Sequence, residues 1–360
     1  MKRSTTLVGL VAVGALTLSA CGTDDNTGTA QSRGNDIDCA TGDLRGAGST
    51  FQKNIVSEWI KDYTGACTGA TVDYQGIGSG AGIKQFGSGT VDFAGTDSTM
   101  KDDEQADADK RCKSPAWHLP VSAGGIAIAY QLEGVDELHL SPATLAGIFQ
   151  GTVKSWDDAA VKADNPDAEL PNVAITAVHR EDSSGTTSVF SKFLAKTAGA
   201  AWKLGEGKEL SWPGSVQGAK GSDGVTQAVL AADGGITYTE VSYADNAGLS
   251  SVKVKNGAGE FVGPEAEAVS TALGGATLPA TGNDLTVDYD FANTTPGAYP
   301  ITAVTYEIVC SKGDPAKQAL LASFLGYAVD DGQDAAEDNG YAPLPGAMTD
   351  RVKAALKAMA

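Results

Sequence analysis

The sequence predicts an α/β protein with mostly parallel sheets, and two observations support this fold class. Short apolar strands alternate with segments of helical periodicity along most of the chain, a pattern typical of parallel strands joined by helices. In addition, roughly 320 of the 360 residues follow residue 38, whereas a typical domain holds ~100–200 residues. The length therefore predicts two lobes.

The N-terminus has the features of a signal peptide. Lys2 and Arg3 precede an apolar run over residues 7–18, which is too short to span a bilayer. Small residues then lead into Cys21, and this ending resembles a bacterial lipobox, in which the cysteine sulfur receives a diacylglyceryl group. We therefore predict a signal peptide over residues 1–20 and lipidation of Cys21. Ordinary secretion with an unmodified Cys21 is the alternative.

Residues 21–38 are expected to form a flexible tether, because Ile37 is their single large apolar residue and such a stretch cannot bury enough surface to fold. No later segment approaches the ~18 uninterrupted apolar residues of a membrane-spanning helix. The protein is therefore expected outside the cytoplasm, held at the cell membrane by its lipid alone.

The chain is strongly acidic. Its formal net charge is −19, or −21 once Lys2 and Arg3 leave with the signal peptide. This charge argues against nucleic acid as a partner and against electrostatic docking on anionic lipid. An anionic ligand would have to be held by local donors that act against the overall field.

The elements of the folded part follow in chain order. Strands are predicted over Leu44–Gly48, Thr71–Gln75, Val91–Ala94, Gly125–Gln131, Val173–Val178 and Ile301–Cys310. Helical periodicity follows the first and the fifth strand, and further helices are expected from Pro315 and from Met348. Residues 252–295 are rich in Gly, Ala and Asn, and we expect them to form an excursion on the surface.

Four cysteines remain besides Cys21, and an even number in an oxidising compartment indicates two disulfides. Cys39 and Cys67 each lie five residues before a predicted strand. If these two strands are parallel neighbours, both sulfurs lie at the same edge of the sheet. We therefore predict the pairs Cys39–Cys67 and Cys112–Cys310. No spacing typical of a metal site occurs, so no metal or other cofactor is expected.

Three strand-to-helix junctions, over residues 46–51, 76–82 and 180–187, are rich in glycine and hydroxyl side chains. The first turn of a helix has unpaired N–H groups and the positive end of the helix dipole, so it can bind an anion. Open α/β sheets also collect ligands at the C-terminal ends of their strands. The alternative is that the serines at these junctions only cap helices. These serines are Ser49, Ser79 and Ser184.

Arg180 is the only cation in the three junctions, and its planar guanidinium suits a tetrahedral oxyanion. Asp182 follows two residues later and could orient it, although a surface Arg–Asp pair is the alternative. Asp97, after the strand over Val91–Ala94, is less expected, because a carboxylate repels an anion. Phosphate near neutral pH still carries a proton that Asp97 can accept, whereas sulfate carries none.

Asp97 is therefore the predicted source of specificity, since a buried acceptor facing an unprotonated oxyanion costs roughly several kcal/mol. Its alternative role is that of a helix N-cap before Ser98 and Thr99.

Four stretches, in this order, resemble the phosphate-binding subunits of phosphate-specific ABC importers. They are GAGSTF from Gly46, YQGIGSGAGIKQF from Tyr74, VDFAGTD from Val91 and HREDSSGTTSVFSKFL from His179. The resemblance covers nearly all of residues 44–345. It implies a periplasmic-binding-protein-like fold, in which two α/β lobes close on phosphate and present it to permease subunits. Combined with the strand pattern, it predicts lobe I over residues 39–128 and 300–360, and lobe II over residues 129–299.

The resemblance also implies a set of phosphate ligands, with Asp182 as the partner of Arg180. The set is Ser49, Thr50, Phe51, Ser79, Asp97, Arg180, Ser184, Gly185 and Thr186. Ser49 and Ser183 stand where small residues vary in this family. A phosphatase or esterase is a weaker hypothesis, because neither a GxSxG serine nor a Walker-type GK[ST] occurs. A binding protein for sulfate or molybdate is the other alternative. We expect a monomer, and no enzyme.

Overall fold

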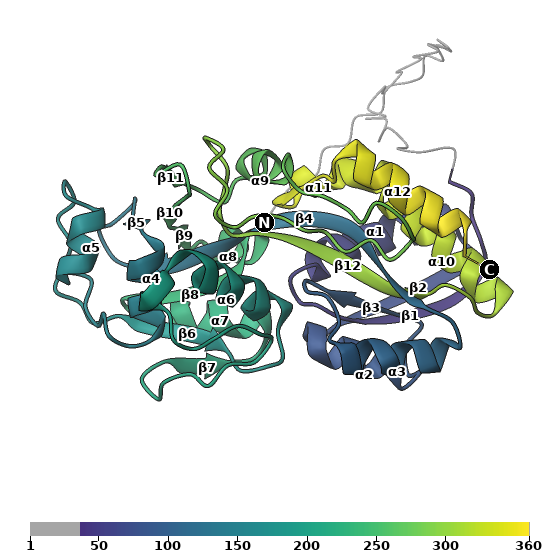
Figure 1. Ribbon diagram of the computed structural model, residues 1–360, viewed down its shortest axis with the longest axis horizontal. Helices are drawn as coiled ribbons and strands as arrows, with labels where there is room; N and C mark the ends of the chain where they lie inside the picture. Colours follow the sequence, from purple (N-terminus) through teal and green to yellow (C-terminus); the bar gives the residue numbers. More distant parts are fainter. Residues whose placement is uncertain (1–36, 360) are drawn as a thin grey trace, which may run out of the picture. The chain divides into compact units, whose positions relative to one another are not determined.

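The computed structural model describes residues 37–359. The predicted signal peptide, the predicted lipidation site Cys21 and the tether up to residue 36 lie outside the described residues. The described chain forms a ten-stranded sheet with the order β2-β1-β3-β12-β4-β8-β6-β7, in which β13 and β9 also pair with β4 (Figure 1). Within this part of the chain, no helix combines the length and the apolar character that crossing a bilayer requires.

One half of the sheet contains four neighbouring strands: β1 (Gly42–Gly48), β2 (Ala70–Gly76), β3 (Phe93–Thr96) and β12 (Thr302–Cys310). β1 runs parallel to β2 and β3, and β12 is antiparallel to β3. Helices α2 (Ser79–Gly87) and α3 (Asp102–Cys112) cover one face, while α1 (Lys53–Ala66), α10 (Pro315–Ala328) and α12 (Gly346–Lys357) lie on the other (Figure 1).

Both predicted disulfides are confirmed. Leu44 of β1 lies opposite Val72 of β2, so cysteines at the same offset before each strand meet at one edge. The Cys39 and Cys67 Cα atoms are 5.4 Å apart. Cys112, the last residue of α3, is joined to Cys310 at the end of β12, with 5.3 Å between their Cα atoms.

The strand β4 (Ala116–Gln131) connects the two halves of the sheet. Its first part pairs with β12 as far as Gly125, and its second part pairs with β8 from Ile126 onward. The prediction that this strand begins at Gly125 is therefore wrong, since it begins nine residues earlier. Nearly every residue of β4 is buried, because the strand is central in both halves. β13 (Tyr341–Ala342) and β9 (Ser250–Ser251) pair with it as short additions.

The second half of the sheet contains β8 (Gly235–Glu240), β6 (Thr176–Arg180) and β7 (Gln217–Ala219), all mutually parallel where they pair. Helices α4 (Pro142–Phe149) and α6 (Gly185–Thr197) share an aromatic core with Tyr238, whereas α7 (Gly221–Leu230) and α8 (Val241–Ala247) share a separate aliphatic core with Val178. The predicted fifth strand thus lies about two residues later than expected, which makes Arg180 its last residue.

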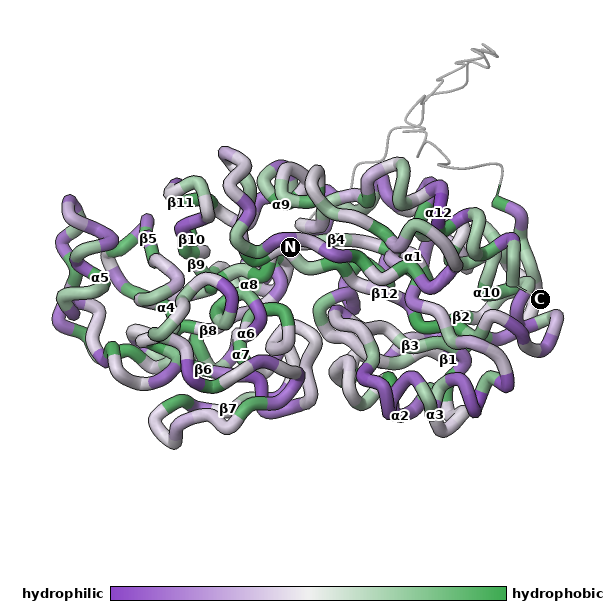
Figure 2. Tube along the Cα trace, viewed as in Figure 1, coloured by the Kyte–Doolittle hydropathy of each residue, from purple (hydrophilic) through white to green (hydrophobic). Residues whose placement is uncertain are grey.

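The expectation of a surface excursion over residues 252–295 is correct in part: most residues of this segment are exposed or half-buried, but the segment also contains regular elements. It contains β10 (Lys253–Lys255), β11 (Phe261–Val262) and α9 (Ala266–Leu273), and β10 and β11 form a small sheet with β5 (His139–Leu140). Some of its apolar side chains, including Val254, Val269 and Leu285, are buried. By contrast, α3 is largely hydrophilic in Figure 2, and Ala108 is its one buried residue. The remaining short helices are α5 (Ala159–Asp164) and α11 (Asp334–Asp338).

Candidate functional site

The three glycine-rich junctions lie at one place. Gly48 at the end of β1 pairs with Gly76 of β2 and with Gly95 of β3, so the loops that follow these strands begin at the same edge of the sheet. The loop after β6 reaches this edge from the other half, since Gly80 donates its N–H to the Ser183 carbonyl at 2.9 Å. The contact is close, because a Cβ added at Gly80 would lie 2.2 Å from Ser183 Oγ.

Asp97 follows β3 and is surrounded by hydroxyl groups. Its Oδ1 accepts hydrogen bonds from Ser49 Oγ at 2.5 Å and from Thr305 Oγ1 at 3.0 Å, and Ser79 Oγ lies 3.4 Å from Oδ2. Burial raises the pKa of Asp97 to about 6, although these hydroxyls and the positive charge of Arg180 oppose the shift. Asp97 is not a helix N-cap, because the residue that precedes α3 is Lys101. That alternative is wrong.

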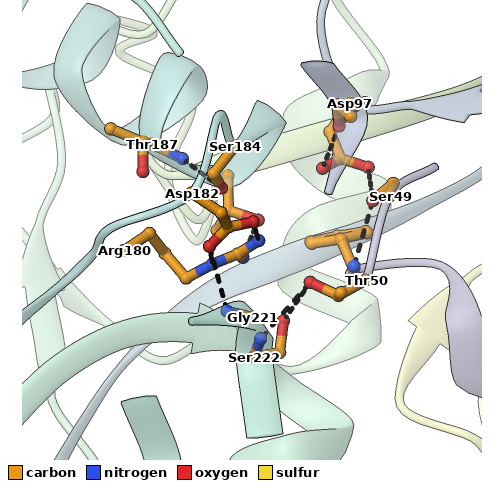
Figure 3. Close-up of polar contacts among 12 residues, drawn as sticks. Ser49, Thr50, Asp97, Arg180, Asp182, Ser184, Thr187, Gly221 and Ser222 are labelled. Atoms are coloured by element: carbon orange, nitrogen blue, oxygen red, sulfur yellow. Dashed lines mark hydrogen bonds and ion pairs between the residues drawn. The ribbon is translucent and has the colours of Figure 1, made fainter. Parts of the chain in front are cut away.

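Arg180 and Asp182 form a bidentate ion pair on the opposite side of the site (Figure 3). Nε donates to Oδ1 at 2.7 Å and the terminal nitrogen Nη2 donates to Oδ2 at 2.5 Å. Their side chains are only 1% and 10% exposed, so the alternative of a surface pair is wrong. Burial would raise the pKa of Asp182, but hydrogen bonds from Arg180 and from the Gly221 N–H hold that pKa below its usual value.

The Arg180 guanidinium keeps donors that Asp182 does not use. It has five N–H groups, and two of its nitrogens contact Asp182. The third nitrogen, Nη1, lies 3.5 Å from Thr186 Oγ1 in the first turn of α6. These remaining N–H groups can bind an anion at the N-terminus of that helix.

Gly185, the first residue of α6, links the Asp97 side of the site to the Arg180 side. A Cβ added at Gly185 would lie 2.5 Å from Ser79 Oγ and 2.6 Å from Asp97 Oδ2, so only glycine fits against the Asp97 cluster. The next residue, Thr186, contacts Arg180. The structure therefore brings Asp97 and Arg180 to opposite sides of a single helix terminus.

The serines at the junctions differ in their capping roles. Ser184 is the N-cap of α6, because its Oγ accepts the Thr187 N–H at 3.2 Å, yet its own hydroxyl proton remains available. Ser79 is the first residue of α2, and Gly78 occupies the N-cap position without a side-chain bond. Ser49 Oγ accepts the Phe51 N–H at 3.0 Å while donating to Asp97. Capping alone thus does not account for Ser49 and Ser79.

Several residues of the site were missed from the sequence. Thr50 Oγ1 lies 2.8 Å from Ser222 Oγ, and the Ser222 N–H is directed at the same Thr50 oxygen at 3.3 Å (Figure 3). Tyr243 donates its hydroxyl to the Thr50 carbonyl at 2.9 Å. Gly221 and Ser222 form a fourth strand-to-helix junction, which glycine and serine could have indicated. The preceding strand β7 has only three residues, too few for a visible pattern.

The described residues contain no group of three or more His, Cys, Asp or Glu side chains arranged to hold a metal ion. The site combines several hydrogen-bond donors, among them the hydroxyls of Ser49 and Ser79 and the guanidinium of Arg180, with one buried acceptor, Asp97.

Comparison with known proteins identifies the family. Residues 26–332 match the model of the PBP superfamily domain. The chain belongs to this superfamily. Phosphate-binding protein PstS 3 of Mycobacterium tuberculosis is 40% identical over the full length of both chains. Phosphate-binding protein PstS of Xylella fastidiosa is 35% identical, over 86% of this chain and 84% of the relative.

Among solved structures, a high affinity periplasmic phosphate-binding protein bound with phosphate superposes with a TM-score of 0.73. It is 26% identical, and the match covers 87% of this chain and 93% of that one. The two-lobed α/β fold expected for this PBP superfamily member is thereby confirmed, as is the resemblance of its sequence motifs to phosphate-binding proteins.

Proposed function

We propose that the protein binds inorganic phosphate outside the cytoplasm and delivers it to an ABC importer. The observation that carries this proposal is the buried acceptor Asp97, which shares one helix terminus with the cation Arg180. The relatives of this chain are named phosphate-binding proteins, which supports phosphate as the ligand. A protonated tetrahedral anion satisfies both groups, because its charged oxygens face Arg180 and its proton faces Asp97.

The proposed ligands are backbone N–H groups, hydroxyls and the guanidinium. They are Ser49, Thr50, Phe51, Ser79, Asp97, Arg180, Ser184, Gly185 and Thr186, with Asp182 holding Arg180 in place. Because Ser49 already donates to Asp97 and accepts from Phe51, phosphate has to replace or share these bonds. A sulfate ion in the same place would set an unprotonated oxygen against Asp97, which is unfavourable.

We further propose that the site opens and closes by movement of two lobes, residues 39–128 with 300–360 and residues 129–299. The chain crosses between them in β4 and just before β12, so these segments form the proposed hinge. Closure forms the Gly80–Ser183 and Thr50–Ser222 hydrogen bonds and the Lys208–Glu104 ion pair. Bringing donors together in a site from which water is excluded strengthens each electrostatic contact.

Isothermal titration with phosphate and with sulfate, each at about pH 8, tests the proposed function. We expect phosphate to bind and sulfate to bind at least about 100-fold more weakly, as a mismatched buried acceptor predicts. Equal binding of the two ions would favour a general oxyanion-binding protein. The protein is proposed not to be an enzyme, so a colorimetric phosphatase assay with a chromogenic phosphate ester is expected to give no turnover.

Lipidation of Cys21 is proposed as the membrane anchor, and the importer's permease subunits are the proposed partners of a monomeric binding protein. Replacing Cys21 by alanine should release the protein into the culture medium, because an acyl chain supplies the membrane affinity. Thr23→Ala, two residues further on, serves as the control. Persistent membrane association of the Cys21 variant would refute this anchor.

A further inference from the structure

A buried polar chain extends from Asp97 away from the ligand. Thr305 of β12 lies 3.0 Å from Asp97 Oδ1 and is also hydrogen-bonded to the side-chain oxygen of Gln52. The side-chain nitrogen of Gln52 is in turn hydrogen-bonded to Glu307 Oε1. Gln52 and Glu307 are 0% and 1% exposed. Among the described residues, Glu307 Oε2 has no hydrogen-bond partner.

The groups around Glu307 favour its neutral form. Four groups from neighbouring elements surround Glu307. Gln52, just before α1, is hydrogen-bonded to it, and Tyr74 comes from β2. Asp97 follows β3, and Leu119 of β4 is the residue paired with Glu307 in the sheet. None of these groups is a cation, and the charged group among them is the carboxylate of Asp97. Burial, and then the charge of Asp97, raise the pKa of Glu307 well above its usual value. When two carboxyl groups share a buried site, one retains its proton.

The single hydroxyl proton of Thr305 has several acceptors within reach. These are the Gln52 oxygen, the Thr96 carbonyl at 3.3 Å and Asp97 Oδ1 at 3.0 Å. Rotating the Gln52 amide by 180° exchanges its oxygen and nitrogen and leaves the shape of the side chain almost unchanged, and which orientation is present depends on the hydrogen bonds that each one makes. A neutral Glu307 can donate to the amide oxygen. The amide nitrogen then faces Thr305, whose proton becomes available to Asp97.

We propose that Glu307 is a positioning residue for phosphate selectivity, which keeps its own proton and, through Gln52 and Thr305, holds Asp97 as an ionised acceptor. This inference rests on the proposed function. An ionised Asp97 accepts the proton of phosphate, whereas a neutral Asp97 can donate to sulfate. Loss of the Thr305 donor raises the pKa of Asp97, so selectivity against sulfate should then be lost at a higher pH.

The test measures the ratio of sulfate to phosphate dissociation constants between about pH 5 and pH 8.5. In Glu307→Leu and in Thr305→Val, the pH at which this ratio falls should move upward by about one unit. Glu307→Gln, whose amide can still donate to Gln52, should restore the wild-type profile. The double variant should shift no further than Thr305→Val alone, because both act through the same proton.

Thr239→Val is the matched control for Thr305→Val, because Thr239 is a buried strand threonine whose hydroxyl has no partner among the described residues. It should leave the profile unchanged. An unshifted profile in Glu307→Leu, or additive shifts in the double variant, would overturn the proposal.

Infrared spectroscopy provides a second readout that does not need a ligand. At about pH 8, the wild-type protein should show a carboxylic-acid C=O stretching band that is missing from Glu307→Gln. Absence of this difference band would overturn the proposal even if Glu307→Leu does not fold. If the wild-type protein instead binds no phosphate, the proposed function fails while the infrared comparison still decides where the proton of Glu307 resides.

Discussion

The site contains two aspartates, Asp97, which is buried, and Asp182, whose side chain is 10% exposed, and their surroundings give them opposite properties. Asp97 is surrounded by the neutral hydroxyls of Ser49, Ser79 and Thr305, whereas Asp182 accepts two hydrogen bonds from the Arg180 guanidinium. Burial acts on both in the same direction, toward a higher pKa. The pKa of Asp97 rises to about 6, while the pKa of Asp182 stays below its usual value because of Arg180.

The two aspartates therefore have different proposed roles: one orients the guanidinium of Arg180, and the other recognises the proton of the ligand. The charge of Asp182 is matched by Arg180, so its proposed role is to hold the guanidinium and to keep the remaining N–H groups of Arg180 directed at the ligand. Asp97 has no cation of its own among its hydrogen-bond partners, and its proposed role is to accept the proton of the ligand. The same residue type thus takes two roles, which are decided by neighbours from distant parts of the chain.

Removing the cation should have the largest effect. Arg180→Ala leaves Asp182 buried without its partner and removes the charge that offsets the overall negative field. We expect phosphate affinity to fall by on the order of 10²–10³-fold in calorimetric titration. Arg351→Ala is the control, because the hydrogen bonds of Arg351 within the described residues go to the carbonyls of Pro279 and Gly282. An unchanged dissociation constant in Arg180→Ala would exclude Arg180 from the site.

Adding a side chain at Gly185, at the helix terminus between Asp97 and Arg180, should have the next largest effect. In Gly185→Ala, the added Cβ would lie 2.5 Å from Ser79 Oγ and 2.6 Å from Asp97 Oδ2, so the helix terminus cannot approach Asp97. Phosphate affinity should fall about 10- to 100-fold, as overpacking predicts. The matched control is Gly346→Ala, also at the first residue of a helix, where an added Cβ meets nothing within 4 Å. Equal effects of both variants would contradict this account.

The parts of the site that lie within one junction could be predicted from the sequence. Glycines and hydroxyls after a strand are local signals, and the equal offset of Cys39 and Cys67 before β1 and β2 reflects their in-register pairing. The contacts that cross the chain could not be predicted. Thr305 and Asp97 are 208 residues apart, and Thr50 and Ser222 are 172 apart, so no periodicity or spacing relates them.

The first half of β4 was missed for a physical reason. Pro120 interrupts the apolar run, and proline usually argues against a central strand because it lacks an N–H. Here the register with β12 shifts between Thr305 and Tyr306, so that Pro120 lies opposite Tyr306 and Ser122 opposite Thr305. Such an irregularity tolerates proline. Helix α9 was not predicted either, because its apolar pattern is sparse, although its Val269 and Leu273 are buried.

Converting the acceptor into an amide tests the role of Asp97. In Asp97→Asn, the side-chain NH₂ can donate to an unprotonated oxygen, so sulfate becomes acceptable. We expect the ratio of sulfate to phosphate dissociation constants to fall at least about tenfold. Asp164→Asn serves as control, because Asp164 is also held by a hydroxyl and a backbone N–H, from Thr144 and Ser141. Unaltered selectivity in Asp97→Asn would contradict the proposed mechanism.

Lowering the pH should reproduce, in the wild-type protein, part of the loss of selectivity that is expected for Asp97→Asn. The pKa of Asp97 is raised to about 6 by burial, so Asp97 is ionised above this pH and neutral below it. Selectivity for phosphate over sulfate should therefore be high at about pH 8 and should decline as the pH falls through about 6. Asp97→Asn should show no such step. A wild-type ratio that stays constant over this range would show that Asp97 does not titrate in the site.

The smallest expected effect concerns an ion pair that involves neither Asp97 nor Asp182. Lys208 and Glu104 are 2.6 Å apart, with side chains 5% and 23% exposed, and their pairing accompanies closure in the proposed mechanism. Glu104→Gln leaves Lys208 buried without an anionic partner, which should weaken phosphate binding about two- to fivefold and make it less dependent on salt. Glu58→Gln is the matched control, because its 2.6 Å pair with Lys61 lies on the surface of α1, where such pairs contribute little. If Glu104→Gln binds phosphate as tightly as Glu58→Gln does, closure depends on the ligand contacts alone.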